Sequence, residues 1–137
     1  MKKTFLLLAA LLGASAAQAE SPAALLDAYR ADAAAATPSY AGSSAPRGDA
    51  FFHARGKDWS CASCHTADPR QPGRHAVTGK PIRPLAPAAD PTRFTDRAKA
   101  EKWFKRNCKD TRGRECTAAE KADLLAYLIS LGNRSKT

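Results

Sequence analysis

The chain has 137 residues, 44% of them hydrophobic and 26% charged, and a formal net charge of +9 at pH 7. This length accommodates one small domain, and no segment of the mature chain is apolar enough to span a membrane. A basic charge is compatible with nucleic-acid binding, but the aromatic-basic stacking pattern of such proteins is absent. The charge favours attraction to an acidic redox partner or an anionic membrane surface, or simply a solvated basic surface.

The N-terminus is typical of a secretory signal peptide. Met1-Lys2-Lys3 is basic, the apolar run from Phe5 to Leu12 is too short to cross a bilayer, and Ala17-Gln18-Ala19 supplies the small-x-small cleavage pattern. We therefore predict a signal peptide over 1–19, cleaved near Ala19, and one soluble periplasmic domain over 20–137. An N-terminal membrane anchor is the less favoured alternative.

Two helices are expected in the first part of the mature chain. Ser21 is a good N-cap and Pro22 a good first helical residue, so the sequence predicts a helix over 22–36. Ser, Pro and Gly indicate a loop over 37–46, and a second short helix is expected over about 47–55.

Two more helices are expected towards the C-terminus. Thr95 is a candidate N-cap for a helix over about 96–108, and the residues expected to pack inward on it are Ala98, Trp103 and Phe104. Thr117 and Glu120 have the spacing of a capping box that opens a last helix, which Gly132 would end. Its broad apolar face consists of Ala122, Leu124, Leu125, Leu128, Ile129 and Leu131.

The stretch between these two pairs, residues 68–91, is rich in proline and contains no strand signal of useful length. Proline removes backbone donors and restricts the residue before it, so we predict a long loop. In a chain this small, such a loop is uncommon unless it surrounds something. The sequence therefore predicts an all-α protein whose missing core is supplied by a cofactor.

Cys61-Ala62-Ser63-Cys64-His65 is the C-x-x-C-H signature of covalent haem attachment. Two thiols at this spacing can add to the two vinyl groups of one porphyrin, and His65 is then placed as the proximal iron ligand. A redox-active C-x-x-C is expected next to a βαβ unit, and a zinc site requires a second ligand pair at matching spacing. Neither is present, so we predict one covalent haem c on Cys61 and Cys64.

A resemblance to a known fold becomes visible around this motif. Gly48-x-x-x-Phe52 before the motif and Ala122-Asp123-Leu124-Leu125-Ala126-Tyr127-Leu128 after it resemble the class I cytochrome c fold. The resemblance implies an all-α, class I cytochrome c-like fold with an extra N-terminal helix and a long Pro-rich loop around one covalent haem. It also implies a contact among Gly48, Phe52 and Tyr127.

The second axial ligand of the iron is less evident. Met1 is the only methionine, so a mature chain without its signal peptide cannot have the His/Met ligation common in small cytochromes. The candidates are His53, His75, Asn107, a lysine, the α-amine, or no ligand at all. His53 lies on a helix near the haem edge, from which the far face is difficult to reach, whereas His75 lies in the proline-rich loop.

Two cysteines remain after haem attachment, Cys108 and Cys116. An even pair in an oxidising compartment is expected to form a disulfide. Such a bridge would close a loop of about nine residues, with an expected stabilisation of about 2.5 kcal/mol in the chain-entropy model. It would also brace Asn107, the residue beside Cys108.

Two longer segments resemble the Sphaeroides haem protein family. They are His75-Ala76-Val77-Thr78-Gly79-Lys80-Pro81-Ile82-Arg83-Pro84-Leu85-Ala86-Pro87 and Lys102-Trp103-Phe104-Lys105-Arg106-Asn107-Cys108-Lys109-Asp110, the latter followed by Gly113-Arg114-Glu115-Cys116-Thr117. The resemblance implies that Asn107 is the distal ligand of ferric iron and leaves on reduction, opening a site for O2, NO or CO. The related cytochrome c″ group has a histidine at this position, so Asn107 favours the first group.

We therefore predict a periplasmic electron carrier with a gas-binding ferrous state. Its redox partner is expected to be a protein such as a dihaem cytochrome c or a membrane cytochrome b. The alternatives are a small haem enzyme acting on O2, NO, peroxide or hydroxylamine, and a gas-binding sensor. The chain is small and has no evident general acid near Asn107, which argues against the enzyme. The cationic cluster Lys102, Lys105, Arg106 and Lys109 is interpreted as a solvated helix face or a docking surface.

Overall fold

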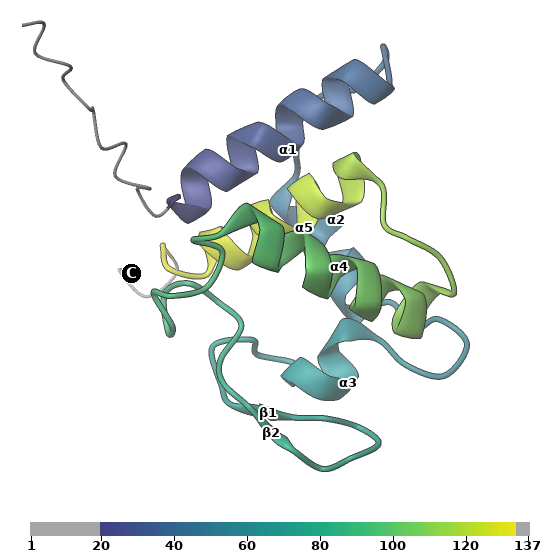
Figure 1. Ribbon diagram of the computed structural model, residues 1–137, viewed down its shortest axis with the longest axis vertical. Coiled ribbons are helices and arrows are strands. Elements are labelled where there is room, and N and C mark those ends of the chain that lie inside the picture. Colours follow the sequence, from purple (N-terminus) through teal and green to yellow (C-terminus); the bar gives the residue numbers. More distant parts are fainter. Residues whose placement is uncertain (1–19, 134–137) are drawn as a thin grey trace, which may run out of the picture.

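The computed structural model describes residues 20–133, so the predicted signal peptide over 1–19 lies outside the described residues, as do residues 134–137. The described part is mainly helical (Figure 1), which confirms the all-α prediction. Its elements are α1 (Pro22–Ala36), α2 (Ala45–His53), α3 (Cys61–His65), β1 (Gly73–Arg74), β2 (Pro81–Ile82), α4 (Arg97–Arg112) and α5 (Ala118–Ser130). Within residues 20–133, no helix is both long enough and apolar enough to cross a bilayer.

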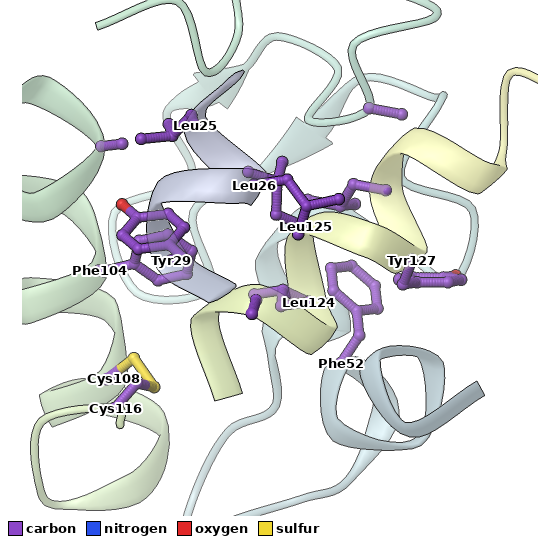
Figure 2. Packing of buried hydrophobic residues seen from close by; sticks show 14 of the residues in the cluster. Leu25, Leu26, Tyr29, Phe52, Phe104, Cys108, Cys116, Leu124, Leu125 and Tyr127 are labelled. Carbon is purple, nitrogen blue, oxygen red and sulfur yellow. A yellow bond between two sulfur atoms is a disulfide. The ribbon is translucent and has the colours of Figure 1, made fainter. Parts of the chain in front are cut away.

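The hydrophobic core is built around α5. Helices α1 and α2 both pack against α5 (Figure 1), and Leu125 and Leu128 of α5 are fully buried. Figure 2 shows Tyr29 of α1 beside Phe104 of α4, with ring centroids 5.7 Å apart and an edge-to-face angle of 87°. Aromatic pairs prefer this geometry. The additional N-terminal helix therefore connects α4 to the core.

The predicted contact among Gly48, Phe52 and Tyr127 is confirmed. The Phe52 and Tyr127 rings lie 5.7 Å apart between centroids. A Cβ atom at position 48 would lie 2.0 Å from the carbonyl oxygen of Asp123, so only glycine allows α2 to approach α5 this closely. This approach holds the segment that leads into α3 against the core.

Helix α1 has the predicted bounds, but α2 begins earlier than predicted and ends at His53. The Ser44 hydroxyl caps α2 by accepting the N–H of Arg47 at 3.3 Å. The buried carboxylate of Asp123 also accepts the backbone N–H of Ser44 at 2.7 Å and the Arg47 side chain at 2.8 Å. A long-range ion pair therefore fixes the start of this helix.

The prediction for the third helix was wrong in three respects. Its N-cap is Asp96, whose carboxylate accepts the N–H of Lys99 at 2.9 Å, whereas the Thr95 hydroxyl donates to the carbonyl of Thr92. The helix continues beyond residue 108 to Arg112 and ends at Gly113, which has a φ of 68°. Of the side chains expected to pack, Phe104 is buried, Ala98 is exposed, and Trp103 is 45% exposed and lines a cavity.

The proline-rich stretch contains one short antiparallel pair that was not predicted. Gly73 pairs with Ile82 and Arg74 with Pro81. A Cβ atom at position 73 would lie 2.1 Å from the carbonyl oxygen of Cys64, so glycine lets β1 lie directly against α3. The last helix has its predicted capping box, but Gly132, which follows its C-cap, is not among the glycines with positive φ.

Candidate haem site

A cavity of about 1700 Å³ is lined by residues of α3, α4 and the β1–β2 segment. Figure 1 shows α3 and the two strands on one side of α4 and the N-terminal helix on the other. Small-ligand pockets usually span roughly 300–1,000 Å³, so this cavity suits a macrocycle better than an ion or a small substrate. Among residues 20–133, no group of three or more His, Cys, Asp and Glu residues could hold a bare metal ion.

The C-x-x-C-H motif forms the short helix α3, and its three functional side chains line the cavity. Ser60 caps the helix: its hydroxyl accepts the N–H of Ser63 at 3.2 Å, and the Ser63 hydroxyl accepts the N–H of Ser60 at 2.9 Å. Cys61 and Cys64 are unpaired and partly buried. Burial raises the pKa of the Cys61 thiol, which disfavours the thiolate that a redox-active C-x-x-C requires.

His65 is suited to ligate a metal-bearing cofactor. Burial, and after it the positive charge of Arg93, lower the pKa of His65 to about 4, so its imidazole is neutral at physiological pH. A neutral imidazole is the form that ligates metals. The His65 Nδ1 atom is buried with no hydrogen-bond partner among the described residues. Buried polar atoms without partners are rare, and here the unpaired ring lies in the wall of the cavity.

Asn107 lies on α4, in the wall contributed by that helix. It follows Trp103, another cavity-lining residue, by one helical turn. The backbone carbonyl of Asn107 accepts the Thr111 hydroxyl at 2.8 Å, but its side-chain amide makes no hydrogen bond within residues 20–133. The amide is therefore free of protein partners on the cavity side of α4.

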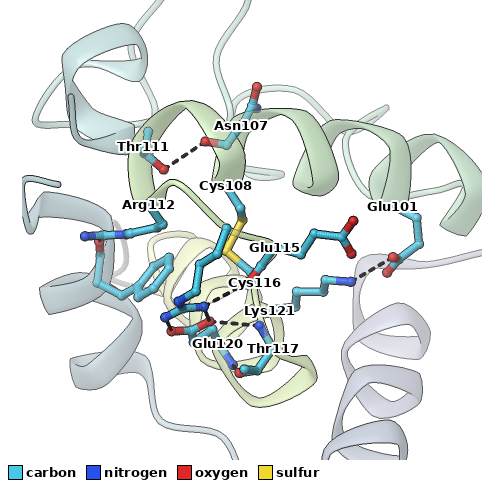
Figure 3. The surroundings of a disulfide bond; sticks show 12 residues. Glu101, Asn107, Cys108, Thr111, Arg112, Glu115, Cys116, Thr117, Glu120 and Lys121 are labelled. Atoms are coloured by element: carbon cyan, nitrogen blue, oxygen red, sulfur yellow. Dashed lines mark hydrogen bonds and ion pairs between the residues drawn. A yellow bond between two sulfur atoms is a disulfide. The ribbon is translucent and has the colours of Figure 1, made fainter. Parts of the chain in front are cut away.

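Cys108 and Cys116 lie at disulfide-bonding distance, with 1.95 Å between sulfur atoms and 5.6 Å between Cα atoms. Figure 3 shows the Cys108 side chain directed towards Cys116 while Asn107 projects from α4 in another direction. A second link joins the same helices, because the Lys121 ammonium lies 2.7 Å from the Glu101 carboxylate (Figure 3). On the two sides of Asn107, helix α4 is thus attached to α5 through Glu101 and to the segment just before α5 through Cys108.

The two histidines considered as distal ligands have different positions. His53 does not line the cavity: its Nδ1 lies 3.0 Å from the Asp49 carbonyl, and its Nε2 lies 3.0 Å from the Ala67 carbonyl. His75 does line the cavity, but its Nδ1 accepts the backbone N–H groups of Val77 and Thr78, both at 3.2 Å. One of its two ring nitrogens is therefore used to close the turn between β1 and β2.

We expect His53 to make stability pH-dependent. Burial works against its charged form, but hydrogen bonds to the carbonyls of Asp49 and Ala67 and the charge of Asp49 raise the pKa of His53 above its usual value. Folding therefore favours the protonated ring, and this stabilisation is complete below the unfolded pKa of about 6.5 and is lost as pH rises through the folded pKa. Urea unfolding at about pH 5.5 and pH 8 should show this loss in the wild type. If the free energy of unfolding of His53→Gln decreases by the same amount between these two pH values, the prediction is contradicted.

Sequence reasoning missed a charged cluster on the cavity wall. Asp90 is only 3% exposed, and its carboxylate pairs with Arg83 at 2.9 Å and Arg93 at 3.4 Å. Arg93 also donates to the carbonyls of Pro84 and Arg83. Arg83 and Asp90 lie in the proline-rich stretch and Arg93 lies two residues after it, and the prolines gave no indication that Arg93 turns inward.

The residues present fit a haem. Two unpaired thiols and a neutral imidazole line a cavity of sufficient size, and Arg83 and Arg93 supply positive charge for the carboxylates of a porphyrin. Asp110 also lines the cavity, three residues after Asn107, and the sequence prediction did not include it. Asp110 is exposed, and the buried Asp90 carboxylate on the cavity wall is already paired with Arg83 and Arg93, so the enzyme alternative gains no unpaired buried acid.

Comparisons with known proteins agree with this interpretation. Residues 38–128 match a family model described as "Domain of unknown function (DUF1924)". The chain is 47% identical over 135 residues to the cytochrome c-type protein SHP of Cereibacter sphaeroides, covering 95% of this chain and 99% of that protein. It is 43% identical over 100 residues to cytochrome c″ of Methylophilus methylotrophus, covering 69% of each.

Solved structures show the same relationship. The structure of oxidised SHP, described as an oxygen-binding cytochrome c, has a TM-score of 0.71 and 46% identity, covering 82% of this chain and 98% of that one. Crystalline oxidised cytochrome c″ has a TM-score of 0.72 and 40% identity, covering 80% and 93%. A solution structure of cytochrome c″, described in terms of haem-ligand detachment, also has a TM-score of 0.72, at 40% identity, covering 81% and 94%.

The helical fold around a C-x-x-C-H cavity, together with these relatives, defines a c-type cytochrome with a class I-like architecture. The comparisons support a haem protein of the electron-transfer and gas-binding kind. Within that class, the chain belongs to the family of SHP and cytochrome c″.

Proposed function

We propose that this chain is an exported, periplasmic electron carrier with one haem c, bound covalently through Cys61 and Cys64. His65 serves as the proximal ligand and Asn107 as the distal ligand of the ferric form. Asn107 leaves on reduction and opens the distal side to O2, NO or CO. A dihaem cytochrome c or a membrane cytochrome b is the proposed kind of redox partner.

The main support for this proposal is that the Asn107 side chain lies at the cavity and has no hydrogen-bond partner among the described residues. The helix around it is attached to α5 at Glu101 and, through Cys108, to Cys116 just before α5. A side chain with no protein partner loses no hydrogen bond when it binds a metal or leaves it. The helix is held, and the side chain is free to move.

The chemistry of the carboxamide agrees with a redox-dependent ligand. When bound, the haem supplies an iron that accepts one electron and binds diatomic gases in its reduced form. A neutral carboxamide is a weak ligand that suits the more highly charged ferric iron, so one added electron weakens its bond. By linkage, a ligand that prefers ferric iron lowers the reduction potential, and a gas that prefers ferrous iron raises it.

An electrochemical titration under argon and under CO tests this function. We expect a higher reduction potential under CO, because the gas binds only the reduced form and stabilises it by mass action. The same buffer at the same pH in a sealed cell keeps the two titrations comparable. Equal potentials under the two gases would contradict a gas-binding ferrous state.

A further inference from the structure

The sequence of α4 divides the helix surface into three stripes. Ala100, Phe104, Cys108 and Thr111 form the buried stripe. Lys99, Trp103, Asn107 and Asp110, spaced three or four residues apart, form the next stripe. Both of these stripes line the cavity, and so does Arg106 at the edge of the remaining side. The remaining side is formed by Lys102, Lys105, Arg106 and Lys109, which are all exposed, and is called the basic face of α4 below.

The positive charge of the basic face is largely uncompensated. Lys105 lies 3.5 Å from the Glu115 carboxylate, and both side chains are more than half exposed. Within residues 20–133, no carboxylate lies within ion-pair distance of Lys102, Arg106 or Lys109. By contrast, Arg30 pairs with Asp27, Arg97 with Asp32, and Arg114 with Glu120.

Trp103 connects the basic face to the cavity. Trp103 lines the cavity and is 45% exposed in all, a value that includes the surface it presents to the cavity. The Arg106 guanidinium lies 5.9 Å from the centre of the Trp103 ring, so the aromatic ring borders the basic face directly. Aromatic and arginine side chains are enriched in protein interfaces. One side chain therefore touches both the cofactor cavity and the surface where a partner would dock.

We propose that the basic face of α4, together with Trp103, is the docking surface for an acidic redox protein. This inference rests on the proposed electron-carrier function and names the surface it uses. We expect the partner to be acidic, because the unpaired cations of the basic face attract an acidic protein and accelerate its association. The partner then lies against the helix that carries Asn107, on the distal side of the cavity.

Stopped-flow reduction of the ferric holoprotein by an acidic flavodoxin in its hydroquinone form tests the proposal. One electron passes from the flavin, which becomes the semiquinone, to the ferric iron, which becomes ferrous. The variant Lys102→Gln/Lys109→Gln removes two charges from the basic face. The matched control Arg30→Gln/Arg74→Gln removes two charges from α1 and β1, away from α4 (Figure 1).

We expect the second-order rate constant to fall about tenfold in the α4 variant at low ionic strength and less than about twofold in the control. High salt should remove the difference, because it screens exposed charges. Reduced lumiflavin, a small donor without an acidic protein surface, should reduce all three proteins at nearly equal rates. Equal rates for both variants with flavodoxin would overturn the docking surface alone. A wild type that accepts electrons from neither donor would overturn the carrier function and the docking proposal with it.

Discussion

Replacing Asn107 by alanine is expected to abolish the low-spin ferric state and to raise the reduction potential. The amide lies in the cavity wall, and alanine at this position cannot reach a metal. Coupling energies between linked equilibria are typically about 1–3 kcal/mol. For a one-electron couple this corresponds to a rise of about 40–130 mV. Optical spectra of the ferric protein and a potentiometric titration measure the two effects.

Asp110→Ala is the matched control for this variant. Asp110 lines the same cavity, one turn further along α4, and is also exposed to solvent. It should retain the low-spin ferric spectrum and shift the potential less than Asn107→Ala does. If Asn107→Ala keeps a low-spin ferric spectrum, another residue completes the coordination, and His75 becomes the candidate because it also lines the cavity.

Removing the link between Cys108 and Cys116 is expected to lower the free energy of unfolding by about 2.5 kcal/mol, the chain-entropy value for so short a loop. The double variant Cys108→Ser/Cys116→Ser should also weaken the low-spin ferric state, because Asn107 is the neighbour of Cys108 on α4. Urea unfolding followed by circular dichroism gives the first effect, and the ferric spectrum gives the second. An unaltered ferric spectrum in the destabilised protein would show that the link is purely structural.

Glu101→Gln is the matched comparison for the disulfide variant. It weakens the other attachment of α4 to α5, the ion pair of Glu101 with Lys121, in which the Glu101 side chain is 40% exposed. Ion pairs of this exposure usually contribute at most about 1 kcal/mol. A smaller loss of stability than in the cysteine variant is therefore expected. Mass spectrometry after thiol alkylation independently establishes whether Cys108 and Cys116 are bonded.

The parts of the fold that depend on local chemistry could be predicted from the sequence. Ser21 and Pro22 determine where α1 begins, and the capping box of Thr117 and Glu120 determines the start of α5. The haem-attachment motif places all three of its functional side chains along a single cavity wall because they lie on one short helix. These features depend on residues at most a few positions apart.

The features that could not be predicted depend on distant residues. Thr95 and Asp96 are both good N-caps, and the choice between them involves the distant Glu20, whose N–H donates to the Thr95 carbonyl and whose carboxylate accepts the N–H of Arg97. The inward position of Arg93 results from its contacts with the carbonyls of Pro84 and Arg83. Proline content indicates that a segment is irregular, but it does not show which of its side chains face a cavity.

Neighbouring positions of helix α4 have separate roles. The buried stripe of α4 holds the helix against the core through Phe104 and Cys108, and Asn107 faces the cavity. The basic face is then left to solvent or to a partner. A change in the buried stripe should mainly affect stability, a change at Asn107 should affect iron coordination, and a change in the basic face should affect association with a partner.

The most direct measurement of the central claim is the optical spectrum of the wild-type protein before and after reduction, followed by addition of CO. The account predicts a six-coordinate low-spin ferric form and a five-coordinate high-spin ferrous form that binds CO. A ferrous form that stays six-coordinate and does not react with CO would contradict it.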